Sequence, residues 1–204
     1  MANPLPHEAR TDDPRFQRSL KALRAAVLDL VATGPLADLS ITRLVQAAGV
    51  TRPTFYQHFA DIPDAARRVA LALLDQAFPV PPPFPAGIEI TPDSLFARIE
   101  GNALPVIRHL QAHRSFYVNV LEGAGNAAFF EEVVTFLSGR FLPEGNALAP
   151  RDPHGDRMTV MAGGLMWLVV RWLRDDGAAD APEPMAWRAA DAAVSLLLPV
   201  NQKR

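Results

Sequence analysis

The sequence of residues 38–61 is Asp-Leu-Ser-Ile-Thr-Arg-Leu-Val-Gln-Ala-Ala-Gly-Val-Thr-Arg-Pro-Thr-Phe-Tyr-Gln-His-Phe-Ala-Asp, and it predicts two short helices joined by a tight turn. Apolar side chains recur at helical spacing in the first half, and Ser40 can accept a backbone N–H that the start of this helix leaves unpaired. Gly49 suits the turn because glycine adopts the left-handed conformation without a Cβ clash. Thr51 can cap the second helix, and Pro53 falls in its first turn, where a missing N–H costs nothing.

The second of these helices offers a polar face to a partner. Phe55 and Phe59 lie four residues apart and are expected to pack inward. This leaves for the outer surface Arg52, Thr54, Tyr56, Gln57 and His58. A short helix displayed in this way suits the major groove of double-stranded DNA. Arg52 and Gln57 are candidates for base edges, since arginine can bond guanine and glutamine adenine bidentately.

The stretch from Ser40 to Phe59 closely resembles the helix-turn-helix of the TetR/AcrR family of bacterial transcriptional regulators. The matching features are Ala-Ala-Gly-Val at 47–50, the capping Thr51, and Thr-Phe-Tyr-Gln-His-Phe at 54–59. The resemblance covers the N-terminal third of the chain and implies that Tyr56 and His58 contact the DNA backbone. Together with the reasoning from the residues, it makes the expected DNA-binding set Thr42, Arg43, Thr51, Arg52, Thr54, Tyr56, Gln57 and His58.

One position departs from the family pattern. Family members commonly place a Lys just after the recognition helix, where it grips phosphate, but here Asp61 and Asp64 bring two acids and no base. Fewer phosphate contacts predict a shallower salt dependence and a weaker non-specific affinity. Arg10, Arg15 and Arg18 in the N-terminal arm are candidates to compensate.

The remaining pattern predicts an all-α chain of about nine or ten helices. A helix beginning at Pro14 joins the two short helices in a three-helix DNA-binding domain over residues 1–62. A connecting helix is expected at 63–78, and it is the expected lever between the two halves. Residues 79–204 begin with a proline-rich connector, which cannot be helical, and are expected to form a helical ligand-binding and dimerisation domain.

The last two predicted helices, roughly 156–175 and 184–198, bear on assembly. Glycines on one and alanines on the other permit close helix approach, and the first is apolar around much of its circumference. Both helices could be central in one monomer's core, or they could form a four-helix interface with a second copy. Residues 163–173 look like the dimerisation helix common in the family, so a homodimer is expected. Its interface residues would be Gly163, Gly164, Trp167, Ala189, Ala193 and Leu196.

The C-terminal half also contains side chains suited to an apolar cavity between helices. The candidates are Phe96, His109, His113, Phe116, Tyr117, Phe129, Met161 and Met166. For each of them a place in the ordinary core is the alternative. Such a pocket would take an unknown small effector, apolar or aromatic with one or two polar handles. His109 and His113 have the spacing of paired metal ligands, but no third ligand can be identified, so neither a metal nor a cofactor is expected.

Composition limits the classes of function. The chain has no Cys, which excludes disulfides, thiolate metal sites and cysteine catalysis and fits a reducing cytoplasm. No signal peptide is evident, and the longest apolar stretch, 158–170, is too short to span a bilayer, so no membrane partner is expected. A net charge of −2 argues against a broadly basic nucleic-acid coat. Without a phosphate loop, nucleophile elbow or zinc-helix signature, an enzyme is not expected.

These observations predict a sequence-specific DNA-binding transcriptional regulator. Its expected form is a ligand-responsive repressor that binds a palindromic operator as a homodimer, because two recognition helices one helical turn or a multiple apart read a palindrome. Repression of transcription is commoner in the family than activation, and activation stays open. The alternative is a helix-turn-helix protein that has lost DNA binding and acts through protein or ligand contacts, to which the acidic stretch 61–64 gives weight.

Overall fold

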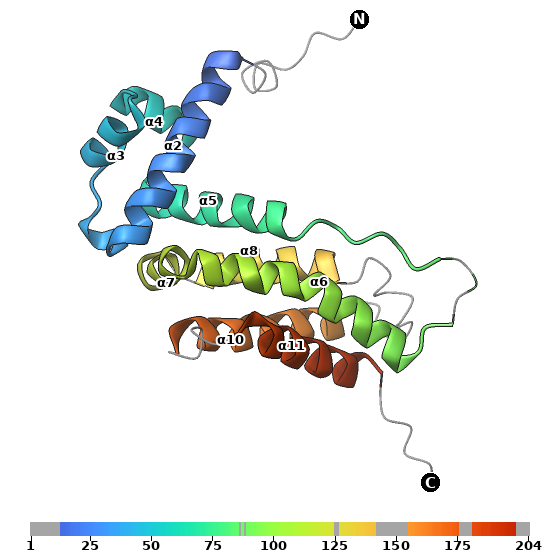
Figure 1. Ribbon diagram of the computed structural model, residues 1–204. Coiled ribbons are helices and arrows are strands. Elements are labelled where there is room, and N and C mark those ends of the chain that lie inside the picture. The colour runs from blue at the N-terminus through green and yellow to red at the C-terminus, as the bar shows by residue number, and fades with distance from the viewer. Residues whose placement is uncertain are drawn as a thin grey trace, which may run out of the picture. The chain divides into compact units, whose positions relative to one another are not determined.

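The computed structural model in Figure 1 describes residues 13–85, 87, 89–124, 127–141, 155–175 and 181–198. Over these residues the chain forms nine α-helices and one 3₁₀ helix and contains no strand, so the predicted all-α fold is confirmed. The bounds are α2 Pro14–Thr33, η1 Leu36–Asp38, α3 Ile41–Ala48, α4 Arg52–His58, α5 Ile62–Ala77, α6 Pro92–Ala112, α7 Arg114–Gly123, α8 Ala127–Phe141, α10 Asp156–Arg174 and α11 Pro182–Leu197. None of the described helices is both long enough and apolar enough to cross a membrane.

The chain divides into two compact units. The first holds the residues through Leu71 together with Ser115–Gly125, and the second holds Ala72–Arg114 and the residues from 126 onward. Helix α5 therefore contributes its first part to one unit and its last turns to the other. Helix α7, which follows α6 in the chain, belongs from Ser115 onward to the first unit.

Local rules explain the two short helices of the first unit. The Ser40 side chain accepts the backbone N–H of Arg43 at 3.2 Å and begins α3. Gly49 ends α3 with a left-handed φ of 63°, and the Thr51 side chain accepts the backbone N–H of Thr54 at 3.3 Å to begin α4. The predicted helix-turn-helix is therefore confirmed, including both caps and the glycine turn.

The first unit has an apolar core formed by all its helices. Helix α2 contributes side chains from a single stripe, and α3 and α4 contribute one fully buried residue each. The least exposed of these side chains are Leu23, Val27, Val31, Leu44 and Phe55. Helix α7 is joined to α2 by a hydrogen bond of 2.7 Å from Asn119 Nδ2 to the Val31 carbonyl. The core thus buries one side of α4 and leaves the other side to solvent.

Gly123 at the end of α7 lies against the 3₁₀ helix, where a Cβ added to it would be 2.4 Å from the Leu36 Cβ. We expect Gly123→Ala to lower the free energy of unfolding by about 1–3 kcal/mol, because backbone has to move to relieve the overlap. Gly101→Ala in α6 is the matched control, since its Cβ would meet nothing within 4 Å and alanine favours a helix interior by about 0.5–1 kcal/mol. Urea unfolding followed by circular dichroism measures both variants, and equal stabilities would contradict the expectation.

The second unit is a bundle built from α6, α8, α10 and α11. Helix α11 packs on α6, and α10 packs on both α8 and α11. Thr91 and Ser94 form a reciprocal capping box at the start of α6. Arg108 of α6 pairs with Glu183 of α11 at 2.7 Å, at an exposed position. The bundle core is closed by side chains of α10 and α11 that are almost fully buried: Met161, Ala162, Met185, Ala186, Ala193 and Leu197.

Candidate nucleic-acid interface

The outer face of α4 carries most of the predicted DNA-binding residues. Arg52 and Gln57 are exposed, Tyr56 keeps 53% of its surface accessible, and Thr54 is half-buried. On the inner face of the same helix Phe55 is fully buried, as predicted. The Tyr56 ring contacts the Phe55 ring edge-on, with 5.4 Å between the ring centroids, so the exposed ring packs against the buried one.

The starts of α3 and α4 are brought together at this face. Arg52 Nη1 donates to Thr42 Oγ1 at 3.4 Å, which links the first turn of α4 to the first turn of α3. Thr51 Oγ1 lies 2.9 Å from Thr54 Oγ1. Thr42, Arg43 and Thr51 are all exposed. Seven of the eight predicted residues therefore lie at least partly accessible on two adjoining helices.

The expected exposure of His58 is wrong. His58 is the last residue of α4 and keeps only 6% of its surface accessible. Its imidazole turns toward α2, where Nε2 lies 2.8 Å from Ser19 Oγ. The centroid of the ring lies 4.1 Å from that of Phe16, with the two ring planes tilted by 50°. The physical reason is position: His58 follows Phe55 by three residues and precedes Phe59 by one, so it shares the inward side of the helix.

The two acids that follow α4, Asp61 and Asp64, have a structural role. Asp61 Oδ1 accepts the backbone N–H of Asp64 at 2.7 Å, and Asp64 Oδ2 accepts that of Ala60 at 3.0 Å. Asp64 also lies 3.9 Å from Arg67 and 3.8 Å from Arg68. Asp61 and Asp64 thus cap the start of α5. The negative charge of Asp64 is partly compensated by the two arginines, so the net negative charge next to α4 is smaller than the sequence suggests.

Helix α2 places two basic side chains near its start. Arg15 and Arg18 are exposed, and Arg18 Nε donates to the Pro14 carbonyl at 3.2 Å. Arg10 lies outside the described residues. Lys21 and Arg24, further along α2, are exposed as well, so basic side chains extend beyond its first turns.

The predicted effector residues are distributed over both units. Phe116 and Tyr117 are buried in the first unit. The other six belong to the second unit, where Phe129, Met161 and Met166 are buried and Phe96, His109 and His113 are half-buried. The rings of His109 and His113 lie 4.7 Å apart, and burial followed by the His113 charge lowers the pKa of His109. Within the described residues no group of three or more side chains is arranged to hold a metal ion.

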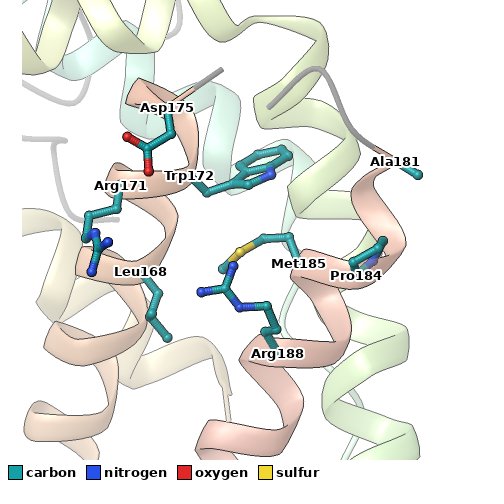
Figure 2. Close-up of a pocket in the computed structure, with 8 residues that line it drawn as sticks. All are labelled: Leu168, Arg171, Trp172, Asp175, Ala181, Pro184, Met185 and Arg188. Atoms are coloured by element: carbon teal, nitrogen blue, oxygen red, sulfur yellow. The ribbon is translucent and has the colours of Figure 1, made fainter. Parts of the chain in front are cut away.

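A cavity of about 340 Å³ lies between α10 and α11 in the second unit. Figure 2 shows Arg188 and Trp172 extending from opposite helices into the space between them. The cavity is lined by Leu168, Arg171, Trp172, Asp175, Ala181, Pro184, Met185 and Arg188. None of the eight predicted effector residues lines it, so the predicted pocket stays a prediction.

The predicted interface residues differ in their accessibility. Trp167 on α10 and Leu196 on α11 keep 54% and 50% of their surfaces accessible, Gly164 is exposed and Gly163 is half-buried. Ala189 and Ala193, in contrast, are buried within the chain on the side of α11 that carries Met185 and Leu197, so they are not accessible to a second copy. Sequence reasoning missed Val160, which is 64% exposed one turn before Gly164 and could have been found by its helical spacing.

Comparisons with known proteins agree with a helix-turn-helix regulator at a coarse level. The HTH-type transcriptional regulator EthR, from two strains of Mycobacterium tuberculosis and from Mycobacterium bovis, is 38% identical to this chain over 72 residues. The match covers 35% of this chain and 32% of each relative, so the chain matches about a third of their length. No protein-family model matches the chain.

Proposed function

We propose that this chain is a transcriptional regulator of the TetR/AcrR type that binds double-stranded DNA sequence-specifically through α4. The observation that carries the proposal is the two-sided character of this helix: Phe55 is fully buried, while Arg52, Tyr56 and Gln57 on the other side are exposed. A helix with a fixed inner face and an accessible polar outer face is what major-groove recognition requires. The similarity to EthR, a helix-turn-helix transcriptional regulator, supports the same function.

The accessible and partly accessible residues of this face fall into two groups by chemistry, those assigned to bases and those assigned to phosphates. Arg52 and Gln57 are assigned to base edges, where each side chain can make paired hydrogen bonds. Thr54 is assigned to a thymine methyl group. Hydroxyl and basic groups at the margins are assigned to phosphates, because such contacts set the position of a protein on the duplex. These are Thr42, Arg43, Thr51 and Tyr56.

We also propose that two copies associate through α10 and α11 and read a palindromic operator. The support is the accessible apolar surface of these helices, which includes Val160, Trp167 and Leu196. Gly163 and Gly164 add to it, because a Cβ at either would meet nothing within 4 Å and the backbone is open to close approach. Apolar area of this kind, buried against a second copy, stabilises a homodimer.

Trp167→Asp is expected to raise the dissociation constant of the dimer about thirtyfold or more, since a buried tryptophan at an interface contributes about 2 kcal/mol or more. Val80→Asp is the matched control, because Val80 is 56% exposed against 54% for Trp167 and lies in the connector before α6. Sedimentation velocity over a concentration series measures both. A wild-type chain that stays monomeric, or a Trp167 variant that dimerises like the control, would contradict the proposed interface.

We also propose that a small ligand regulates DNA binding. A small effector bound in the second unit would favour a conformation in which the two recognition helices no longer match the operator, with α5 as the element shared by both units. The coupling is reciprocal, so operator DNA weakens effector binding by the same factor. Repression of transcription in the cytoplasm is the proposed outcome of operator binding.

Selection from a pool of random duplexes tests the function. The purified full-length chain is mixed with the pool, the bound fraction is sequenced, and the cycle is repeated. The proposal predicts enrichment of an inverted repeat whose half-sites lie about one helical turn or a multiple apart. Enrichment of no sequence would contradict it and would favour a helix-turn-helix that serves protein contacts. The enriched sequence is called the selected duplex below.

A further inference from the structure

We propose that His58 is a positioning residue: its neutral imidazole ties α4 to Ser19 of α2, and its carbonyl ties α4 to Arg68 of α5. Acid favours an imidazolium that leaves this buried site, which releases the first tie and weakens DNA binding. The part that concerns DNA rests on the proposed function. The part that concerns the imidazole is independent of DNA. The role differs from the phosphate contact that the family resemblance implies for this residue.

The hydrogen bonds around Ser19 decide the tautomer of His58. Ser19 Oγ donates to the Phe16 carbonyl at 2.9 Å, and a hydroxyl has a single hydrogen to donate. Its second contact, at 2.8 Å to His58 Nε2, is then a hydrogen bond only if Nε2 donates and Oγ accepts. The imidazole therefore carries its hydrogen on Nε2 and a bare lone pair on Nδ1.

The surroundings of the other ring nitrogen, Nδ1, make protonation unfavourable. His58 Nδ1 is buried and has no hydrogen-bond partner among the described residues. Protonation would place a second N–H and a charge there with no acceptor, at a site that also faces Arg24 of α2 and Arg68 of α5. Asp64, the acid in this neighbourhood, lies against Arg68 at 3.8 Å. Burial first, and then the Arg68 and Arg24 charges, hold the pKa of His58 below its ordinary value of 6.5.

The carbonyl side of His58 holds a different helix. Arg68 Nη1 donates to the His58 carbonyl at 2.7 Å and so satisfies an acceptor at the end of α4 that has no partner within the helix. The same guanidinium lies over the Phe59 ring at 5.4 Å from its centroid. The end of α4 is thus held by side chains of two helices, since Ser19 of α2 contacts the His58 ring and Arg68 of α5 contacts the His58 carbonyl. This arrangement sets the direction in which the exposed face of α4 points within its unit.

The sign of the pH effect follows from the direction of the pKa shift. An imidazole freed from these contacts binds its proton at the ordinary pKa, and the tied imidazole binds it only at lower pH. Protonation at Nδ1 leaves the Nε2–H in place, so acid acts by favouring an imidazolium that has left the buried site. The preference for the tied, neutral state is therefore full above the ordinary pKa of 6.5 and declines as the pH falls from there toward the lowered pKa of the tied ring. A phosphate contact by His58 would have the opposite sign, because a protonated imidazole binds DNA more tightly than a neutral one.

The first part of the test measures affinity for the selected duplex by anisotropy at about pH 7.5 and about pH 5.5. These values lie on either side of the ordinary pKa of histidine. Wild type is expected to bind about fivefold more weakly at the lower pH, within the roughly tenfold limit that proton binding by a freed imidazole sets about one pH unit below its ordinary pKa. His58→Gln keeps an N–H donor at a similar reach and does not titrate, so its affinity is expected to change little. Ser19→Ala removes the acceptor and is expected to bind weakly at both pH values. Stronger wild-type binding in acid, or an equal pH effect in His58→Gln, would overturn the proposal.

The second part of the test needs no DNA, so it separates failure of this inference from failure of the proposed function. The imidazole nitrogens of the full chain are observed by ¹⁵N NMR, and the His58 signals are assigned by their absence in His58→Gln. The expected result is a hydrogen on Nε2 at neutral pH and a titration midpoint below 6.5, the ordinary value. A hydrogen on Nδ1, or a midpoint at or above the ordinary value, would overturn the proposal whether or not the chain binds DNA.

Discussion

Replacing Arg52 and Tyr56 together by alanine is expected to weaken binding to the selected duplex about a hundredfold, since a bidentate arginine–base contact alone contributes about 1–3 kcal/mol. Tyr56 adds a phosphate contact that sets the position of α4 on the duplex. Both side chains are exposed, and the hydrogen bond between Arg52 and Thr42 joins two exposed groups, so the fold is expected to survive. Anisotropy titration at two salt concentrations measures the effect.

Two controls separate lost recognition from lost charge or lost folding. Arg108→Ala removes the same charge from an exposed position on α6 and is expected to leave the affinity unchanged, since an exposed ion pair such as that of Arg108 with Glu183 contributes little. A scrambled duplex is expected to bind wild type weakly and the double variant only a few times more weakly, because non-specific binding loses one phosphate contact and one positive charge but no base contact. A double variant that binds the selected duplex like wild type would show that α4 does not read DNA.

Phe55→Ala is expected to lower the free energy of unfolding of the first unit by about 3–5 kcal/mol, as for other buried phenylalanines. The side chain is fully buried and supports Tyr56 and Phe59, with ring centroids at 5.4 Å and 5.8 Å. The loss is a large part of the stability of a small folded unit. Operator binding is expected to fall with it, because the exposed face of α4 depends on this anchor.

Hydrogen exchange measured by mass spectrometry over α2, α3 and α4 reports this change in the unit that contains it. All three tryptophans, Trp167, Trp172 and Trp187, lie in the second unit, so tryptophan fluorescence follows that unit separately. Tyr56→Ala is the matched control, since it removes the adjacent but exposed ring and is expected to change stability by no more than about 0.5 kcal/mol. Equal exchange rates in α2–α4 of the two variants would contradict the assigned core position of Phe55.

Short-range rules were sufficient to predict the helix-turn-helix. Ser40, Gly49 and Thr51 act within three or four residues of themselves, and the structure places each as a cap or turn. The spacing of Phe55 and Phe59 predicted their burial in the same way. The all-α fold follows from the same helical spacing repeated along the chain.

Residues whose role depends on distant partners could not be predicted. Ser19 is 39 positions from His58, and no local pattern joins them. A signal for the burial of His58 was nevertheless present, because its three-residue spacing from Phe55 places it on the inner side of α4. The caps that Asp61 and Asp64 form were likewise readable from their place around the first turn of α5.

In the second unit, too, contacts between residues distant in the sequence could not be predicted from local patterns. Ala189 and Ala193 are small residues at helical spacing, a pattern that fits a dimer interface and an internal contact equally well. Packing within the chain decided for the internal contact. The cavity between α10 and α11 depends on the directions in which Trp172 and Arg188 extend from their two helices. Residue spacing along one helix gives no information about side chains on the other, so the cavity could not be predicted.

Methylation interference on the selected duplex tests whether α4 reads the major groove. Dimethyl sulfate methylates guanine N7, which faces the major groove, and adenine N3, which faces the minor groove, so one reaction contains both the test and its control. If α4 reads the major groove, N7 methylation in each half-site depletes molecules from the wild-type-bound fraction and N3 methylation does not. Arg52→Ala is expected to lose the effect at one guanine per half-site. Interference from adenine N3 alone, or from no methylated base, would contradict recognition by α4.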